Sequence, residues 1–217
     1  MRTLVVVLVC AAAAAASAEP RRGNIAGSVA VLAGDAPLED RSGVLVYVDA
    51  VAEARRGPAK THQMGQQDKA FSPSLLVIQK GDAVEFPNHD HIFHNVFSLS
   101  KGLSFDLGLH KSGTRPTTTF DRPGSADVFC NIHPQMAATI KVLDNGYFAL
   151  TGRDGSFRIA GVPAGSHVVV AWSRNGKEQR KTVVVEPGQT AQASFEVVEI
   201  RRLRIHVRKD GTPYPRY

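Results

Sequence analysis

The chain has 217 residues, of which 43% are hydrophobic and 21% charged, and its formal net charge is +6 at pH 7. This composition supplies enough apolar material for a folded core, so it excludes a disordered chain, and the length allows one large or two small domains. The basic residues are not interleaved with aromatic ones, which argues against a protein that binds nucleic acid.

The first 18 residues are typical of a signal peptide. Arg2 gives a positive start, residues 4–16 form an apolar run, and Ala16-Ser17-Ala18 is a small-residue cleavage site. The run is short for a membrane span, and no later segment is apolar enough to be one. A lipid anchor on Cys10 is an alternative that the preceding Val9 disfavours. The sequence therefore predicts a periplasmic or secreted protein without a transmembrane segment, cleaved after Ala18.

Short apolar runs, separated by Gly, Pro, Asn or Asp, follow one another along the rest of the chain. Many alternate or are rich in β-branched residues, and no later window of helical length carries an apolar stripe, which predicts an all-β sandwich fold. Asp154-Gly155 and Asn175-Gly176 are dipeptides typical of hairpin turns. The expected strands are residues 25–32, 44–48, 75–79, 83–86, 95–98, 117–120, 126–130, 139–143, 156–159, 167–172, 181–185 and 192–198.

Residues 201–217 form a basic C-terminal tail. We expect it to be solvated, and docking to an acidic redox partner is the alternative. The last four residues, Tyr214-Pro215-Arg216-Tyr217, are expected to fray. The basic side chains of the tail's first half are Arg201, Arg202, Arg204, Arg208 and Lys209.

One cysteine needs an explanation. Removal of the signal peptide would take Cys10 away and leave Cys130 as the single thiol of the mature chain. A lone thiol in an oxidising compartment is exposed to oxidation or mispairing unless it is buried or bound to a metal. Cys130 is therefore a candidate metal ligand.

A cluster of metal-binding residue types surrounds this cysteine. Cys130, His133 and Met136 stand at the spacing C-x2-H-x2-M in a short loop between two expected strands, and His94 lies 36 residues upstream, where a neighbouring strand can present it. Two imidazoles and a thiolate with a weak thioether suit a type 1 copper site. Zinc is the competing metal, because it also takes Cys and His, but a thioether is a poor zinc ligand. We expect one copper ion.

The remaining histidines do not repeat this pattern. His89 and His91 form a single H-x-H element, whereas a multicopper oxidase needs several such pairs. We interpret both as exposed loop residues near the copper, with the binding of a second ion left open. Met64 is expected to pack in the core. The others, His62, His110, His167 and His206, are scattered without ligand spacing.

Residues 69–143 resemble a cupredoxin, close to the plastocyanin and amicyanin group. The motifs that carry the resemblance are Phe71-x-Pro73, Gly81-Asp82-x-Val84-x-Phe86-x-Asn88, His94-Asn95-Val96, Phe120-x3-Gly124 and Phe129-Cys130-x2-His133-Pro134-x-Met136. The resemblance implies a Greek-key β-sandwich for residues 60–143. It also implies His94, Cys130 and His133 as equatorial copper ligands and Met136 as the axial one, with Asn95 holding the two ligand-bearing loops together. Many cupredoxins have Pro where this chain has Ile132.

A second resemblance concerns residues 19–59 and 144–200. The strand Gly23-Asn24-Ile25-Ala26-Gly27-Ser28-Val29 and the stretch from Asp154 to Gly165 resemble a transthyretin-like, carboxypeptidase-regulatory-type β-sandwich. We predict a discontinuous domain of this kind, with the cupredoxin unit inserted at a surface loop. The alternative is that the N-terminal strands pair with the copper domain.

These features favour one function over two others. The leading hypothesis is an exported protein that transfers single electrons to a redox partner through copper. Copper delivery is the second, although the chain lacks a Met-rich tract, and an interaction role for the transthyretin-like unit is the third. No nucleophile, base and orienting acid fall into a recognisable arrangement, so an enzyme is not predicted.

Overall fold

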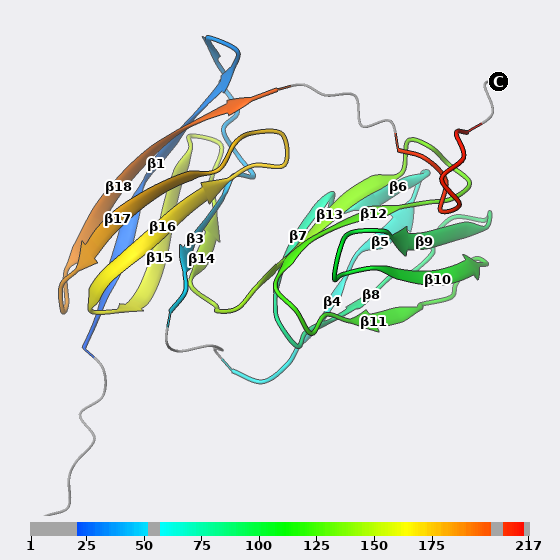
Figure 1. Ribbon diagram of the computed structural model, residues 1–217, viewed down its shortest axis with the longest axis horizontal. Coiled ribbons are helices and arrows are strands. Elements are labelled where there is room, and N and C mark those ends of the chain that lie inside the picture. Colours follow the sequence, from blue (N-terminus) through cyan, green and yellow to red (C-terminus); the bar gives the residue numbers. More distant parts are fainter. Residues whose placement is uncertain (1–20, 52–56, 201–205, 215–217) are drawn as a thin grey trace, which may run out of the picture.

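The computed structural model describes residues 21–51, 57–200 and 206–214. Within these ranges every regular element is a β-strand, and none is a helix that could span a membrane. The predicted all-β sandwich class is confirmed. The predicted signal peptide lies outside the described residues. Figure 1 shows two layered β units arranged side by side along the long axis of the molecule.

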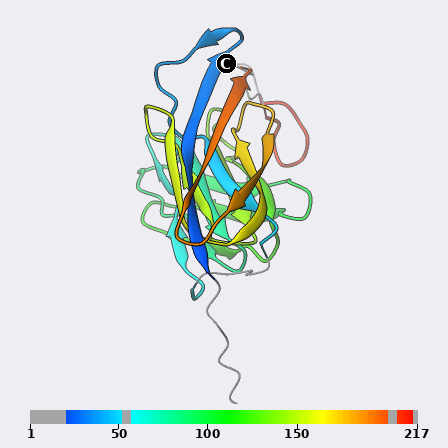
Figure 2. The same cartoon turned by 90° about the vertical axis from the view of Figure 1, so that its left-hand side faces the viewer.

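The first unit, which we call the terminal sandwich, combines strands from both ends of the chain. One sheet has the order β15-β1-β18, with β2 paired to β1, and the other has the order β14-β3-β16-β17. β1 and β18 run parallel and lie side by side in Figure 2. The bounds are β1 Arg22–Ala33, β2 Ala36–Pro37, β3 Leu45–Asp49, β14 Phe148–Leu150, β15 Ser156–Pro163, β16 Gly165–Trp172, β17 Gln179–Val185 and β18 Thr190–Glu199.

The second unit, the central sandwich, lies between β3 and β14 in sequence. It has a five-stranded sheet of order β10-β9-β12-β13-β7, a three-stranded sheet of order β11-β8-β4, and the hairpin β5-β6. The bounds are β4 Thr61–Gln63, β5 Gly65–Gln67, β6 Ala70–Ser72, β7 Leu75–Gln79, β8 Ala83–Glu85, β9 His94–Ser98, β10 Phe105–His110, β11 Thr117–Thr119, β12 Gly124–Phe129 and β13 Ala137–Leu143.

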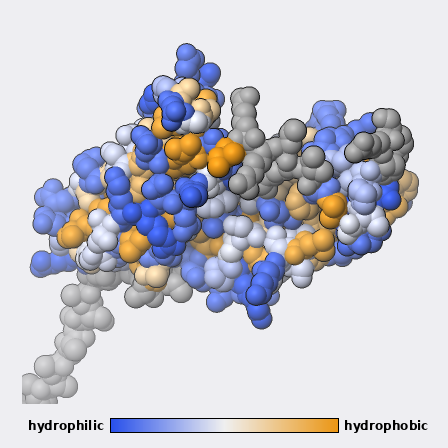
Figure 3. Space-filling view, turned by 45° about the horizontal axis from the view of Figure 1, so that its top comes forward, coloured by the Kyte–Doolittle hydropathy of each residue, from blue (hydrophilic) through white to orange (hydrophobic). Residues whose placement is uncertain are grey.

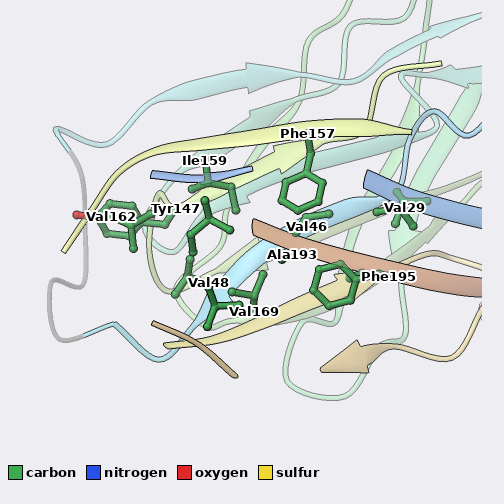
Figure 4. Close-up of a cluster of buried hydrophobic side chains, with 14 of the residues drawn as sticks. Val29, Val46, Val48, Tyr147, Phe157, Ile159, Val162, Val169, Ala193 and Phe195 are labelled. Carbon is green, nitrogen blue, oxygen red and sulfur yellow. The ribbon is translucent and has the colours of Figure 1, made fainter. Parts of the chain in front are cut away.

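Alternation along β18 shows how this strand contributes to the core of the terminal sandwich. In β18 every second residue from Ala193 to Val197 is buried and those between are exposed, as expected for a strand with one face on a core. Phe195 packs against Phe157 of the opposite edge strand β15, with ring centroids 6.3 Å apart. Figure 4 shows side chains of both sheets converging on this apolar core.

β3 is buried on both faces, which explains its unbroken apolar sequence. Val46 and Val48 point into the terminal core, whereas Leu45 and Tyr47 belong to a separate cluster. That cluster joins the two sandwiches, because it also contains side chains of β7, β13 and β16. The sheet that holds β3 therefore packs against the sheet that holds β7 and β13.

Polar contacts cross the same interface. The Lys141 ammonium of β13 lies 4.9 Å from the ring centroid of Trp172 and 5.8 Å from that of Tyr47. Arg174 donates a hydrogen bond to the Ser74 carbonyl at 3.0 Å. These contacts add cation–π attraction and direction to an otherwise apolar contact between the units.

The expected strands each overlap an observed one. Not expected were β2, β4, β5, β6 and β14, which have three residues or fewer, and β10, whose pairing with β9 shifts between Asp106 and Leu109. Asn175-Gly176 lies in a hairpin, between the paired strands β16 and β17. The hairpin predicted at Asp154-Gly155 is wrong: this turn links β14 and β15, which belong to different sheets.

Candidate metal centre

His94 begins β9, whose five residues are all buried in the central sandwich. The strand pairs with β10 on one side, where His94 lies opposite His110, and with β12 on the other through Phe97 and Phe129. The His94 side chain is fully buried, and its strand lies inside the sheet between β10 and β12. It is therefore held by a rigid element and not by a loop.

The other three candidate ligands lie in the loop of residues 130–136 between β12 and β13. The loop is closed at its base, where the Cys130 amide donates to the Met136 carbonyl at 3.3 Å. A turn inside it is fixed by the Met136 amide, which donates to the His133 carbonyl at 3.0 Å. The loop is short and internally bonded, so its side chains have little freedom to move apart.

Three donor atoms from these elements meet at one point. The Nδ1 atoms of His94 and His133 are 3.1 Å apart, and the Cys130 Sγ lies 4.0 Å from the first and 3.7 Å from the second. Of the described residues, only these three form a group of His, Cys, Asp or Glu donors that could hold an ion. A triangle of two imidazole nitrogens and a thiol suits copper in a trigonal site.

The hydrogen bond of the other His94 nitrogen fixes the role of Nδ1. His94 Nε2 lies 2.7 Å from a carboxylate oxygen of Asp90, so Nε2 carries the proton and donates it. The Nδ1 lone pair is then free to point toward His133 and Cys130. Two imidazole nitrogens and a sulfur facing one another in a buried place suit a shared cation, so the residues fit the metal that the sequence predicts.

Asp90 is fixed from several sides, and the sequence did not point to it as a partner of His94. Its carboxylate also accepts the amides of Asp68 and Lys69 at 2.7 and 3.0 Å. Partial burial acts to raise the pKa of Asp90, but the hydrogen bonds from Lys69 and His94 outweigh it, and the pKa lies below its usual value. The group is thus an anion that holds the orientation of His94. Its only sequence signal is its position four residues before His94.

His133 is the candidate ligand nearest to solvent. Its side chain is partly exposed, whereas Cys130, His94 and Met136 are almost completely buried. Burial, followed by the nearby His94, lowers the pKa of His133 below that of a free imidazole. At neutral pH the ring is therefore uncharged, which is the form that binds a metal.

The remaining sequence candidates lie either in the central core or on the surface. Met136 is 1% exposed and belongs to the central core beside Cys130, at the base of the same loop. Met64 is also packed in this core, as predicted. His89 and His91 are exposed and lie outside the donor group.

The role expected for the Asn95 side chain is wrong. Its amide donates to the Asp106 carboxylate at 2.9 Å and to the Gly108 carbonyl at 2.7 Å, so it fastens β9 to β10. Its oxygen is buried without a hydrogen-bond partner, and thus does not reach the loop of residues 130–136. The irregular pairing of β10, which the sequence did not indicate, brings Asp106 and Gly108 to this amide.

The C-terminal segment of residues 206–214 lies against the same loop. In Figure 1 this red segment runs beside the central sandwich, at the end away from the terminal sandwich. The Tyr214 hydroxyl donates to the Cys130 carbonyl at 2.5 Å, so the expected fraying of this residue is wrong. Burial, followed by the charge that Cys130 carries when ionised, raises the pKa of Tyr214 to about 12, so the phenol is protonated and can donate at neutral pH.

The chain is similar to copper-binding proteins over part of its length. Residues 59–143 match the family model for copper binding proteins of the plastocyanin/azurin family. No curated protein matches the chain.

Three solved structures show the range of the structural matches. A Cu-containing nitrite reductase (NirK) from Thermus scotoductus SA-01 is 26% identical with a TM-score of 0.37, over 44% of this chain and 25% of that chain. The purple cupredoxin from Nitrosopumilus maritimus is 24% identical with a TM-score of 0.34, over 37% and 98%. Amicyanin from Paracoccus versutus is 24% identical with a TM-score of 0.36, over 44% and 90%.

The family match and the donor group lie in the same part of the chain. The matched range contains His94, Cys130, His133 and Met136 and coincides with the central sandwich. The family match and this set of donors both support one copper ion as the cofactor. Residues 59–143 therefore form a cupredoxin unit, the part of the chain that the family model for copper binding proteins of the plastocyanin/azurin family matches.

Proposed function

We propose that this protein is an exported electron carrier with a type 1 copper site, in which His94, Cys130 and His133 are the equatorial ligands and Met136 is the axial ligand. The observation that carries the proposal is the triangle formed by the two Nδ1 atoms and the Cys130 sulfur. Bound copper supplies the one-electron change between Cu(I) and Cu(II). The protein's residues hold the ligands in place and keep water away.

Rigidity of the ligand frame supports electron transfer over delivery of copper. His94 is held by a central strand and by the Asp90 carboxylate, and the loop of residues 130–136 is closed by its own backbone bonds. A frame that does not rearrange when the charge of the metal changes favours rapid electron exchange, whereas a delivery site needs open ligands that exchange readily.

We also propose His133 as the point where the electron enters and leaves. It is the partly exposed ligand, and three exposed apolar residues lie beside the ligands in sequence: Ile92 and Phe93 before His94, and Ile132 before His133, at 40%, 54% and 45% exposure. On the face drawn in Figure 3, hydrophobic residues lie in small groups among hydrophilic ones. Such an apolar rim suits brief contact with a redox protein, and the net charge of +6 suits an acidic one.

The domain division also remains a proposal. We propose that residues 19–59 and 144–200 form a transthyretin-like domain into which the cupredoxin domain is inserted. The pairing of β3 with β14 and β16, and of β1 with β15 and β18, supports it. Export of the mature chain rests on the signal-peptide pattern of residues 1–18.

The test is an absorption spectrum of the chain from residue 19 onward, titrated with Cu(II). We expect an intense blue thiolate-to-copper band that saturates at one ion per chain and is absent from Cys130→Ser. His94→Ala should weaken or abolish the band, and His91→Ala is the matched control that should keep it. Loss of the band in His91→Ala, or colourless binding by the unaltered protein, would overturn the ligand assignment.

A second measurement separates the carrier from a copper-delivery protein. We expect a reversible one-electron potential and rapid electron self-exchange, with copper lost only slowly to a chelator. Ready transfer of copper combined with slow self-exchange would favour delivery. We propose no enzymatic activity for the domain.

A further inference from the structure

The C-terminal segment of residues 206–214 contacts three consecutive residues at the start of the ligand loop. The His206 ring stacks on Phe129, with centroids 4.2 Å apart and planes 21° apart. Tyr214 bonds the Cys130 carbonyl, and the Lys209 amide donates to the Asn131 side-chain oxygen at 2.9 Å. The segment therefore follows the backbone on which the candidate thiolate ligand sits.

The segment has an internal structure that fits it for this contact. A turn is closed by the Arg208 amide, which donates to the Thr212 carbonyl at 2.9 Å, and Asp210 accepts both the amide and the hydroxyl of Thr212. The turn brings His206 and Tyr214 together, with ring centroids 5.1 Å apart and nearly perpendicular planes. The turn is thus held by hydrogen bonds within the segment itself. These bonds place the rings of both His206 and Tyr214 beside the ligand loop.

The same segment also reaches the strand that carries the other ligand. The Lys209 ammonium forms an ion pair of 2.7 Å with Asp106, and Asp106 accepts the side-chain amide of Asn95, the residue after His94. Both ligand-bearing elements are therefore linked to one segment: the loop at Cys130 directly, and β9 through Asp106. The connection between these two elements, which the sequence assigned to Asn95, thus runs through a part of the chain more than 100 residues away.

We propose that residues 206–214 act as a strap that holds the ligand loop in its binding geometry before copper arrives, with Tyr214 as the positioning residue for the backbone of Cys130. The strap follows β18 in the chain, so it links the copper site to the terminal sandwich. In the loaded protein, the positive end of the Tyr214 hydroxyl dipole points at the carbonyl of the thiolate ligand and favours the more electron-rich, reduced site. This second effect rests on the proposed function, whereas the first does not need copper.

The first test is hydrogen exchange of the full chain without copper. In Tyr214→Phe we expect the amides of residues 129–136, apart from Pro134, which has none, to exchange about five- to tenfold faster. This is the effect of losing one hydrogen bond that limits local opening. The matched control is Tyr147→Phe, which removes another buried tyrosine hydroxyl, the one that accepts Arg22 at 2.7 Å in the terminal sandwich. This control should leave exchange in residues 129–136 unchanged.

A surface variant keeps the proposal testable if Tyr214→Phe does not fold. Lys209→Ala removes an exposed side chain and its ion pair with Asp106, and we expect a smaller acceleration, about twofold, in the same amides. The proposal that residues 206–214 hold the loop would be overturned by either of two results. One is unchanged hydrogen exchange of residues 129–136 in both Tyr214→Phe and Lys209→Ala, and the other is an equal acceleration in Tyr147→Phe.

The second test uses the copper-loaded chain. Tyr214→Phe should lower the reduction potential and speed the loss of copper to a chelator several-fold, with the blue band retained, whereas Tyr147→Phe should leave both unchanged. An unchanged potential would overturn the electronic role of Tyr214. If the unaltered protein forms no blue site, the proposed function fails. The hydrogen-exchange experiment still tests whether residues 206–214 hold the loop, because it needs no copper.

Discussion

The two sandwiches of this chain differ in the kinds of side chain that they bury. The core of the terminal sandwich is made of apolar side chains, and its strand β18 alternates strictly between buried and exposed residues. The polar side chains buried beside it, such as Asn145 and Thr151, bond the backbone of Val48 and Val44. The central sandwich buries thiol, thioether, imidazole and amide groups close to its apolar core, including those of Cys130, Met136, His94 and Asn95.

The difference shows what a functional core requires. An apolar core is held by area and packing, so its residues can be exchanged for others of similar shape. A core that contains polar groups needs partners for them, and in the central sandwich these partners lie outside the strands. Asp90, in the turn before β9, bonds the His94 ring, and Tyr214 of the C-terminal segment bonds the Cys130 carbonyl. The stability of the first core and the geometry of the second should therefore respond to different mutations.

The largest expected effect is on stability alone. Phe157→Ala removes a buried ring from the terminal core and should lower the free energy of unfolding by about 3–5 kcal/mol. Denaturant unfolding can be followed by the fluorescence of Trp172, the single tryptophan of the chain. The blue copper band should persist under conditions where the variant is folded. Loss of the band from the folded variant would contradict the separation of the two cores.

Asp90→Asn should act on the metal and little on the fold. The substitution keeps the size of the side chain and removes the charge that orients His94, so we expect copper affinity to fall about tenfold or more. The measurement is competition with a chelator of known affinity. Asp68→Asn makes the same change at an exposed carboxylate in the adjacent turn and should leave affinity unchanged. Equal losses in both variants would indicate a general charge effect.

Met136→Leu separates packing from ligation at one position. A swap of similar volume in a core changes the free energy of unfolding by less than about 1.5 kcal/mol, so the fold should survive. Loss of the axial thioether should raise the reduction potential, because the weak donor no longer stabilises Cu(II). Met64→Leu, in the same core, is the matched control and should leave the potential unchanged. Equal potentials in the two variants would remove Met136 from the ligand set.

The smallest effect concerns the contact between the sandwiches. Burial, followed by the charges of Glu178 and Asp49, raises the pKa of Tyr47 to about 12. The unfolded chain therefore loses this proton first, near pH of about 10, and the contribution of Tyr47 to stability is lost as the pH rises from there through the folded pKa. Tyr47→Phe should weaken this alkaline decline in denaturant unfolding. Identical declines would show that Tyr47 is not buried at this contact in solution.

The sequence by itself determined the regular parts of this protein and the identity of the donors. Local alternation placed the longer strands, because a strand with one face on a core must repeat every two residues. The unbroken apolar run of residues 44–48 indicated a strand but not which units it joins. The spacing of Cys130, His133 and Met136 indicated a metal loop, because short loops keep near neighbours together.

The tertiary structure alone decided which residues complete the site. Asp90 is near His94 in sequence, yet its carboxylate is directed to Nε2 only because the turn at Asp68 and Lys69 holds it there. Asn95 bonds β10 and not the ligand loop because of an irregular strand pairing. Tyr214 contacts Cys130 although the two residues are 84 positions apart in sequence. This contact depends on where the chain leaves β18, the last strand of the terminal sandwich. The periodicity of apolar residues predicts which face of a strand is buried. Which residues contact that face depends on the three-dimensional path of the chain, because the contacting residues can come from any part of the sequence.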